Sequence, residues 1–181
     1  MTVIIAADPG ISGAACAFYR ADADGPEFIA DVIDLPAIDD GARREIDVLR
    51  FVAWVRKMQP VHAFVENVQP MPSIPDKYGK RRTMGAATTF RFGLVVGQIR
   101  ATIACCGVPI SLIHPQVWKR FYDLKGADKE QSRQKALELH PEAAHWLKRK
   151  LDHGRSEAIL LARYGDRHLI AHRRGLNVRS A

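Results

Sequence analysis

The amino-acid sequence predicts one α/β domain with a mixed β-sheet. Three short apolar segments follow one another within the first 35 residues, which is typical of an antiparallel meander. A segment with helical periodicity then leads to a fourth apolar, β-branched segment at 61–65. A strand reached through a helix is expected to run parallel to a strand already in the sheet. The predicted sheet therefore combines antiparallel and parallel pairs.

The first predicted strand is the run Val3–Ile5, whose β-branched side chains suit a strand buried on both faces. Asp8 follows it and is itself followed by Pro9 and Gly10, which end a strand and turn the chain. The sheet would then hold Asp8 at a fixed position at the end of the strand. A plain turn-forming role for Asp8 is the alternative.

The next predicted elements complete the centre of the sheet. Strands are expected at 14–19 and 27–35, joined by a turn that contains Asp24-Gly25. A helix is expected over 39–58, before Pro60, and the strand at 61–65 then ends at Glu66. Because ligand sites of α/β sheets form at the carboxyl ends of parallel strands, we expect Glu66 beside Asp8.

The segment 70–82 has no core pattern and is predicted to be a mobile loop. It holds a basic cluster and isolated apolar side chains that have no evident core partner. These side chains are Met71, Ile74, Tyr78, Lys80, Arg81 and Arg82.

Helix and strand alternate again in the second half of the chain. The predicted helix at 83–106 carries a face of Gly and Ala, which suits either tight core packing or a subunit interface. A last strand is predicted at 108–113, and helices at 127–139 and from Asp152 to Ala162. Residues 166–181 are predicted to form a loosely ordered basic tail of the single domain 1–181.

The composition favours an intracellular protein that binds a polyanion. The 181 residues carry a formal charge of +7, which favours nucleic acid as a partner. No signal peptide and no apolar run of membrane-spanning length is present in the sequence, so we predict a cytoplasmic protein without membrane contact. Cys16, Cys105 and Cys106 are predicted to be buried, unbridged thiols.

Acidic residues recur at the ends of apolar elements. They are Asp8, Glu66 and the pair Asp152 and Glu157 that brackets His153. Carboxylates brought together repel one another unless a cation lies between them, and Mg²⁺ prefers oxygen ligands. Two such ions about 3.5–4 Å apart can hydrolyse a phosphodiester. His153 and Glu157 are one helical turn apart, whereas Asp152 would act from just before the helix.

Three of these motifs together resemble the RuvC-type Holliday junction resolvases, especially their phage and prophage branch. They are Asp8-Pro9-Gly10, Val65-Glu66-Asn67 and the run from Asp152 to Ala158; Phe90-Arg91-Phe92-Gly93, Trp118-Lys119 and Asp128-Lys129-Glu130 agree with them. The likeness extends from about Val3 to Gly165.

The resemblance implies an RNase H-like fold with a five-stranded mixed sheet flanked by helices. It also implies a homodimer that makes paired nicks in four-way DNA junctions during recombination and repair, with two Mg²⁺ ions per site, Mn²⁺ as a substitute and no small-molecule cofactor. By motif position Asp8, Glu66 and Glu157 correspond to metal ligands. The last motif departs from the usual spacing, so Asp152 and His153 both stay candidates for the fourth ligand.

For a junction-binding protein we expect the loop 70–82 to contact DNA as a wedge that opens the junction, through Met71, Ile74, Tyr78, Lys80, Arg81 and Arg82. Outside the loop, Lys119, Lys129 and Arg133 are predicted to contact DNA phosphates. The alternatives are a nuclease of the same fold that acts on other branched DNA or on RNA, and a DNA-binding relative without activity. An actin-like ATPase is disfavoured, because the chain is short for two lobes and contains no second glycine-rich phosphate loop.

Overall fold

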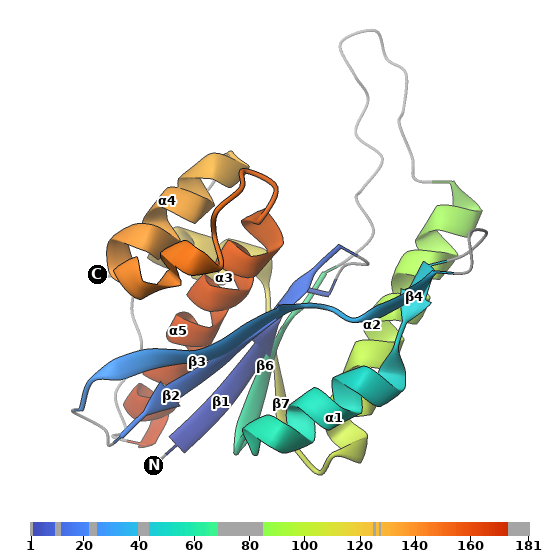
Figure 1. Ribbon diagram of the computed structural model, residues 1–181, viewed down its shortest axis with the longest axis horizontal. Helices are drawn as coiled ribbons and strands as arrows, with labels where there is room; N and C mark the ends of the chain where they lie inside the picture. The colour runs from blue at the N-terminus through green and yellow to red at the C-terminus, as the bar shows by residue number, and fades with distance from the viewer. Residues whose placement is uncertain are drawn as a thin grey trace, which may run out of the picture.

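The computed structural model describes residues 2–9, 12–21, 25–39, 44–68, 85–124, 126 and 128–173. Its centre is a five-stranded sheet in the order β3-β2-β1-β6-β7 (Figure 1). The strands are β1 (Thr2–Ala7), β2 (Ala14–Arg20), β3 (Glu27–Asp34), β6 (His62–Glu66) and β7 (Ile110–Ile113). β1 to β3 pair antiparallel, whereas β6 is parallel to both β1 and β7. The predicted mixed sheet is confirmed.

Helices cover both faces of the sheet. One face carries α5 (His153–Arg173), with α3 (Pro115–Phe121), α4 (Lys129–Leu139) and the 3₁₀ turn η1 (Pro141–His145) around it. The other face carries α1 (Val48–Met58) and α2 (Ala86–Cys105). Figure 1 shows the two helical layers on either side of the strands.

Strand alternation divides the apolar side chains between two cores. Ile4, Ala6 and Phe64 lie in the core under α5, whereas Ile5 and Val65 lie in the core under α1 and α2. Successive side chains of a strand point to opposite faces, so even-numbered positions of β1 and β6 face α5. This alternation decides which way the acids at the strand ends point.

The predicted helix over 39–58 is wrong in its first half. The chain there forms a two-stranded hairpin of β4 (Ala37–Asp39) and β5 (Arg44–Ile46), and the helix begins only at Val48. Asp47 caps the helix by accepting a hydrogen bond from the backbone N–H of Arg50 at 3.0 Å. Asp is among the residues most favoured at this capping position.

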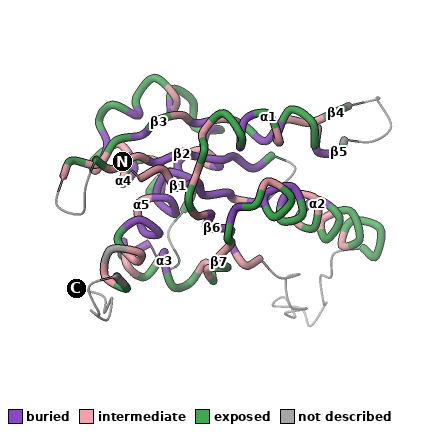
Figure 2. The backbone as a smooth tube through the Cα atoms, turned by 90° about the horizontal axis from the view of Figure 1, so that it is seen from below, coloured by how far each residue is buried: buried purple, intermediate pink, exposed green. Residues whose placement is uncertain are grey.

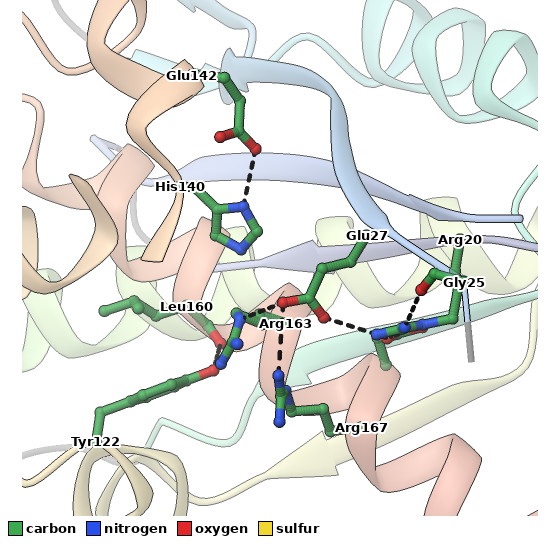
Figure 3. Close-up of polar contacts among 10 residues, drawn as sticks. Arg20, Gly25, Glu27, Tyr122, His140, Glu142, Leu160, Arg163 and Arg167 are labelled. Atoms are coloured by element: carbon green, nitrogen blue, oxygen red, sulfur yellow. Dashed lines mark hydrogen bonds and ion pairs between the residues drawn. The ribbon is translucent and has the colours of Figure 1, made fainter. Parts of the chain in front are cut away.

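The predicted tail is wrong for residues 166–173, because α5 continues to Arg173. Asp166 is buried and accepts hydrogen bonds from Arg20 of β2. Glu27 of β3 accepts from Arg20 and from Arg163, and both bonds are 2.6 Å long (Figure 3). These ion pairs attach the second half of α5 to the edge of the sheet. Residues 174–181 lie outside the described residues.

Two predictions about packing are corrected. Cys16 is buried as expected, but Cys105 is exposed and Cys106 is partly exposed; all three are free. The small-residue face of α2 does not pack in the core: Gly93, Gly97 and their Ala neighbours along it are exposed (Figure 2). The explanation of this face by tight core packing is therefore wrong.

The predicted wedge loop 70–82 lies outside the described residues, together with all of its predicted DNA-contact residues. Among the helices that the structure does describe, none is long and apolar enough to cross a membrane.

Candidate active site

The first two acids of the site lie side by side at the carboxyl ends of two parallel strands. Ala7 of β1 is in register with Val65 of β6, so the next residues, Asp8 and Glu66, are neighbours across the pair. Both occupy even-numbered positions and therefore point towards α5. The predicted placement of Glu66 beside Asp8 is confirmed.

Helix α5 brings the third acid to the same place. Gly154, in its first turn, packs against residues that follow β1 and precede β2: a Cβ there would lie 3.1 Å from the carbonyl oxygen of Ser12 and 3.7 Å from Asp8 Oδ2. A side chain at Gly154 would push the helix away from Asp8. The close approach leaves Glu157, one turn further on, near enough for its charge to act on Asp8.

The electrostatics of the site show that the acids repel one another. Burial, together with the carboxylates of Glu66 and Glu157, raises the pKa of Asp8 to about 7. Burial also raises the pKa of Glu66, against the effect of a hydrogen bond from Trp118. Such a cluster of carboxylates is stabilised by cations. The charges of Lys119 and Lys129 act in this direction on Asp8.

The structure separates Asp152 from the other acids. Its buried carboxylate accepts three hydrogen bonds from Arg149, from the backbone N–H at 2.8 Å, from Nε at 3.0 Å and from Nη2 at 2.7 Å. Burial alone would raise the pKa of Asp152, but the hydrogen bonds and charge of Arg149 hold it below its ordinary value. Asp152 thus closes a turn, while His153 begins α5 at the edge of the site.

The predicted phosphate contacts outside the loop are bound within the protein. Lys119 Nζ lies 2.9 Å from Glu157 Oε1, and Lys129 Nζ lies 3.0 Å from His153 Nε2. Arg133 binds Glu130 of its own helix and donates to the carbonyl oxygen of Leu147 at 2.8 Å. Lys119 and Lys129 therefore belong to the acid cluster, whereas Arg133 supports the backbone.

Trp118 is a site residue that the sequence analysis did not assign. It is fully buried on α3, and its indole Nε1–H donates to Glu66 Oε1 at 2.9 Å. The adjacent Lys119 binds Glu157, so one short helix holds two of the three acids. The pair Trp118-Lys119 was visible in the sequence, but nothing local indicates that an indole so distant in the chain meets Glu66.

Replacing Trp118 by Phe should lower the free energy of unfolding by about 1.5–3 kcal/mol, because the hydrogen bond to a buried charged group is lost. Trp54→Phe is the matched control, since its indole also donates to a carboxylate at 2.9 Å, that of Asp31. Asp31 is only partly buried and keeps a bond from the backbone N–H of Val32, so the control should lose less. Urea unfolding of both variants checks this; equal losses would contradict it.

The donor set fits Mg²⁺ in its chemistry. Asp8, Glu66 and Glu157 supply carboxylate oxygens, which are the ligands that this ion prefers. These carboxylates repel one another, and a bound cation would relieve the repulsion. In the described part of the chain, no three His, Cys, Asp or Glu side chains are already arranged as a metal site. Lys119 and Trp118 hold two of these carboxylates instead.

Two solved structures resemble this chain over nearly its whole length. RuvC from Thermus thermophilus matches with a TM-score of 0.59 and 16% sequence identity, over 96% of this chain and 97% of that one. The same protein in complex with a Holliday junction substrate matches with a TM-score of 0.58 and 14% identity, over the same shares. No protein-family model and no curated protein matches the chain. At these identities the likeness establishes the fold: the chain has the RNase H-like fold of RuvC.

Proposed function

We propose that this chain is a metal-dependent DNA endonuclease that resolves four-way junctions by paired nicks on opposing strands. The observation that carries the proposal is the meeting of Asp8, Glu66 and Glu157 at the carboxyl ends of β1 and β6, with the pKa of Asp8 raised by the other two acids as well as by burial. The RuvC fold supports it, as does the DNA junction bound by one of the structural neighbours.

In this proposal the three acids, with His153, hold two Mg²⁺ ions, for which Mn²⁺ can substitute. When bound, the ions supply an activated water and stabilise the leaving oxygen of the phosphodiester. Glu66 is oriented by Trp118, so that one of its oxygens is occupied by the indole and the other is left for a ligand. Lys119 neutralises Glu157 in the free protein and can turn to the substrate phosphate when Glu157 binds metal.

We also propose a homodimer, built on the exposed half of α2. The buried residues of this helix begin at Val95, and the turns before it contain exposed Phe90 (72%) and Leu94 (41%) beside the small-residue face. Exposed apolar groups next to small residues allow two helices to approach closely. A dimer places two active sites on one junction, which paired nicking requires.

A panel of labelled substrates tests the proposal. We expect the purified protein to nick a synthetic four-way junction in Mg²⁺ at symmetrical positions, and to leave a linear duplex of the same arm sequence intact. Synthetic replication forks, flaps and RNA–DNA hybrids are cut in the same assay. They show whether the protein prefers the four-way junction over other branched DNA and over RNA-containing substrates. Equal cutting of junction and linear duplex, or a preference for the hybrid, would contradict the proposal.

A further inference from the structure

The segment between η1 and α5 forms a rigid turn beside the active site. Its base is fixed from two sides: the carbonyl oxygen of Trp146 accepts from Arg155 at 3.0 Å and that of Leu147 accepts from Arg133 at 2.8 Å. Asp152 closes its far end by the three hydrogen bonds from Arg149. We call residues 148–151 the basic tip.

All four side chains of the basic tip are exposed. Leu151 is 76% exposed, and the cations Lys148, Arg149 and Lys150 precede it. The charge of Arg149 is balanced by Asp152, with which it forms an ion pair. Lys148 and Lys150 make no hydrogen bond or ion pair with any residue that the structure describes. The tip therefore presents two unpaired positive charges and one apolar side chain on a fixed backbone.

The tip lies next to the first turns of α4 and α5. His153 follows it by two residues, and the charge of Lys150 acts on Glu130 at the start of α4, next to the Lys129 that binds His153. In Figure 1 the turn before α5 lies at the same end of the molecule as the carboxyl ends of β1 and β6. The tip cations therefore lie at the end of the molecule that carries the acids, and the structure shows no ion pair between them and these acids.

We infer that the basic tip is a DNA-contact surface: Lys148 and Lys150 bind backbone phosphates of the strand at the active site, and Leu151 packs against the exposed sugar or base. The inference rests on the proposed function, which brings DNA to this edge. The same inference gives Arg133 and Asp152 a role: their hydrogen bonds to Leu147 and Arg149 hold the tip in place, and we do not assign them to phosphate or metal. Rigidity matters because a preordered cation loses less entropy on binding.

The test compares two double variants with the same change in charge. Lys148→Ala/Lys150→Ala removes the tip cations, and Arg56→Ala/Lys57→Ala removes two exposed cations from α1, on the other face of the sheet. The affinity of each for a synthetic four-way junction is measured in EDTA across a salt series. Each lost phosphate contact should flatten the log–log slope by about 0.7 on single strands and 0.9 on duplex.

We expect the tip variant to flatten the slope by about 1.4–1.8 and to bind at least roughly tenfold more weakly at low salt, whereas the α1 variant should follow the wild type. If the two variants have the same slope, the basic tip does not contact DNA, while the proposed function stands. If the wild type itself binds the junction without salt dependence, the proposed function fails first. The two failures are thus distinguishable.

Discussion

We expect Asp8→Asn to abolish Mg²⁺-dependent cleavage of the junction while DNA binding is kept or becomes tighter. The carboxylate is lost from the centre of the acid cluster, where it neighbours both Glu66 and Glu157. Charge stabilisation by metal is worth several kcal/mol in the transition state, so the cleavage rate should fall about a thousandfold or more. The removal of one negative charge also lessens the repulsion of a phosphate, which explains the kept affinity. Glu66→Gln should behave in the same way.

The same variant should be more stable than the wild type at pH 8 in EDTA. The pKa of Asp8 is about 7 in the folded protein and near its ordinary value of 3.8 in the unfolded chain. Between these values the folded state binds more protons, so the wild type loses stability as pH rises through this window and has lost all of the contribution above pH 7. Asn cannot ionise, so the variant does not lose this stability. At about 1.4 kcal/mol per pKa unit, the shift from 3.8 to about 7 corresponds to a loss of the order of 4 kcal/mol in the wild type.

Urea unfolding at pH 4 and pH 8 measures this effect beside the cleavage assay. The advantage of Asp8→Asn should be large at pH 8 and should nearly vanish near pH 4, where Asp8 is protonated in the folded wild type and only about half ionised in its unfolded chain. An Asp8→Asn variant that cleaves the junction at the wild-type rate would remove Asp8 from the active site. A stability difference independent of pH would show that Asp8 does not titrate near pH 7.

His153→Ala should reduce cleavage about a hundredfold or more, whereas Asp152→Asn should lower the rate at saturating DNA by less than about tenfold. The two residues are adjacent in the chain but differ in their contacts. His153 lies beside Lys129 at the edge of the acid cluster, whereas both oxygens of Asp152 are bound by Arg149. A carboxylate so engaged is not free to take a metal, and its loss should act mainly on the basic tip.

Mn²⁺ binding by the two variants, followed by electron paramagnetic resonance, gives a readout independent of turnover. We expect His153→Ala to weaken Mn²⁺ binding and Asp152→Asn to leave it near the wild-type value. Arg149→Ala is a useful companion, because it opens the same turn without removing an acid. The opposite order, with Mn²⁺ binding lost in Asp152→Asn alone, would identify Asp152 as the fourth ligand.

The sequence allowed the sheet and its acids to be predicted because these depend on local patterns. A β-branched run followed by Asp8-Pro9 marks a strand end, and the same holds for Glu66 after 61–65. The partners of the acids could not be predicted, because Trp118 meets Glu66 only through packing between residues 52 positions apart. The sequence left the role of Asp152 open for a related reason: an acid near a helix start suits a metal site and a turn equally well.

The charged surface was also harder to predict than the fold. Lys119, Lys129 and Arg133 are cations near the site in the sequence, and the structure shows that each is bound to a group of the protein. A residue list gives the sign of a charge but not whether an internal partner satisfies it. Arg133 is satisfied within the protein, whereas Lys148 and Lys150 are not satisfied by any residue that the structure describes, so we propose the two lysines as phosphate contacts in place of Arg133.

The most direct test of the account is the resolution of a supercoiled plasmid that extrudes a cruciform, with the purified protein in Mg²⁺. Two nicks made within one binding event convert the plasmid to a linear form, whereas unpaired nicks give an open circle. We predict linear product with the wild type, and none with Asp8→Asn or in EDTA. A plasmid that remains supercoiled in Mg²⁺, or that is cut equally without the cruciform, would contradict the assignment of these acids to a junction-resolving site.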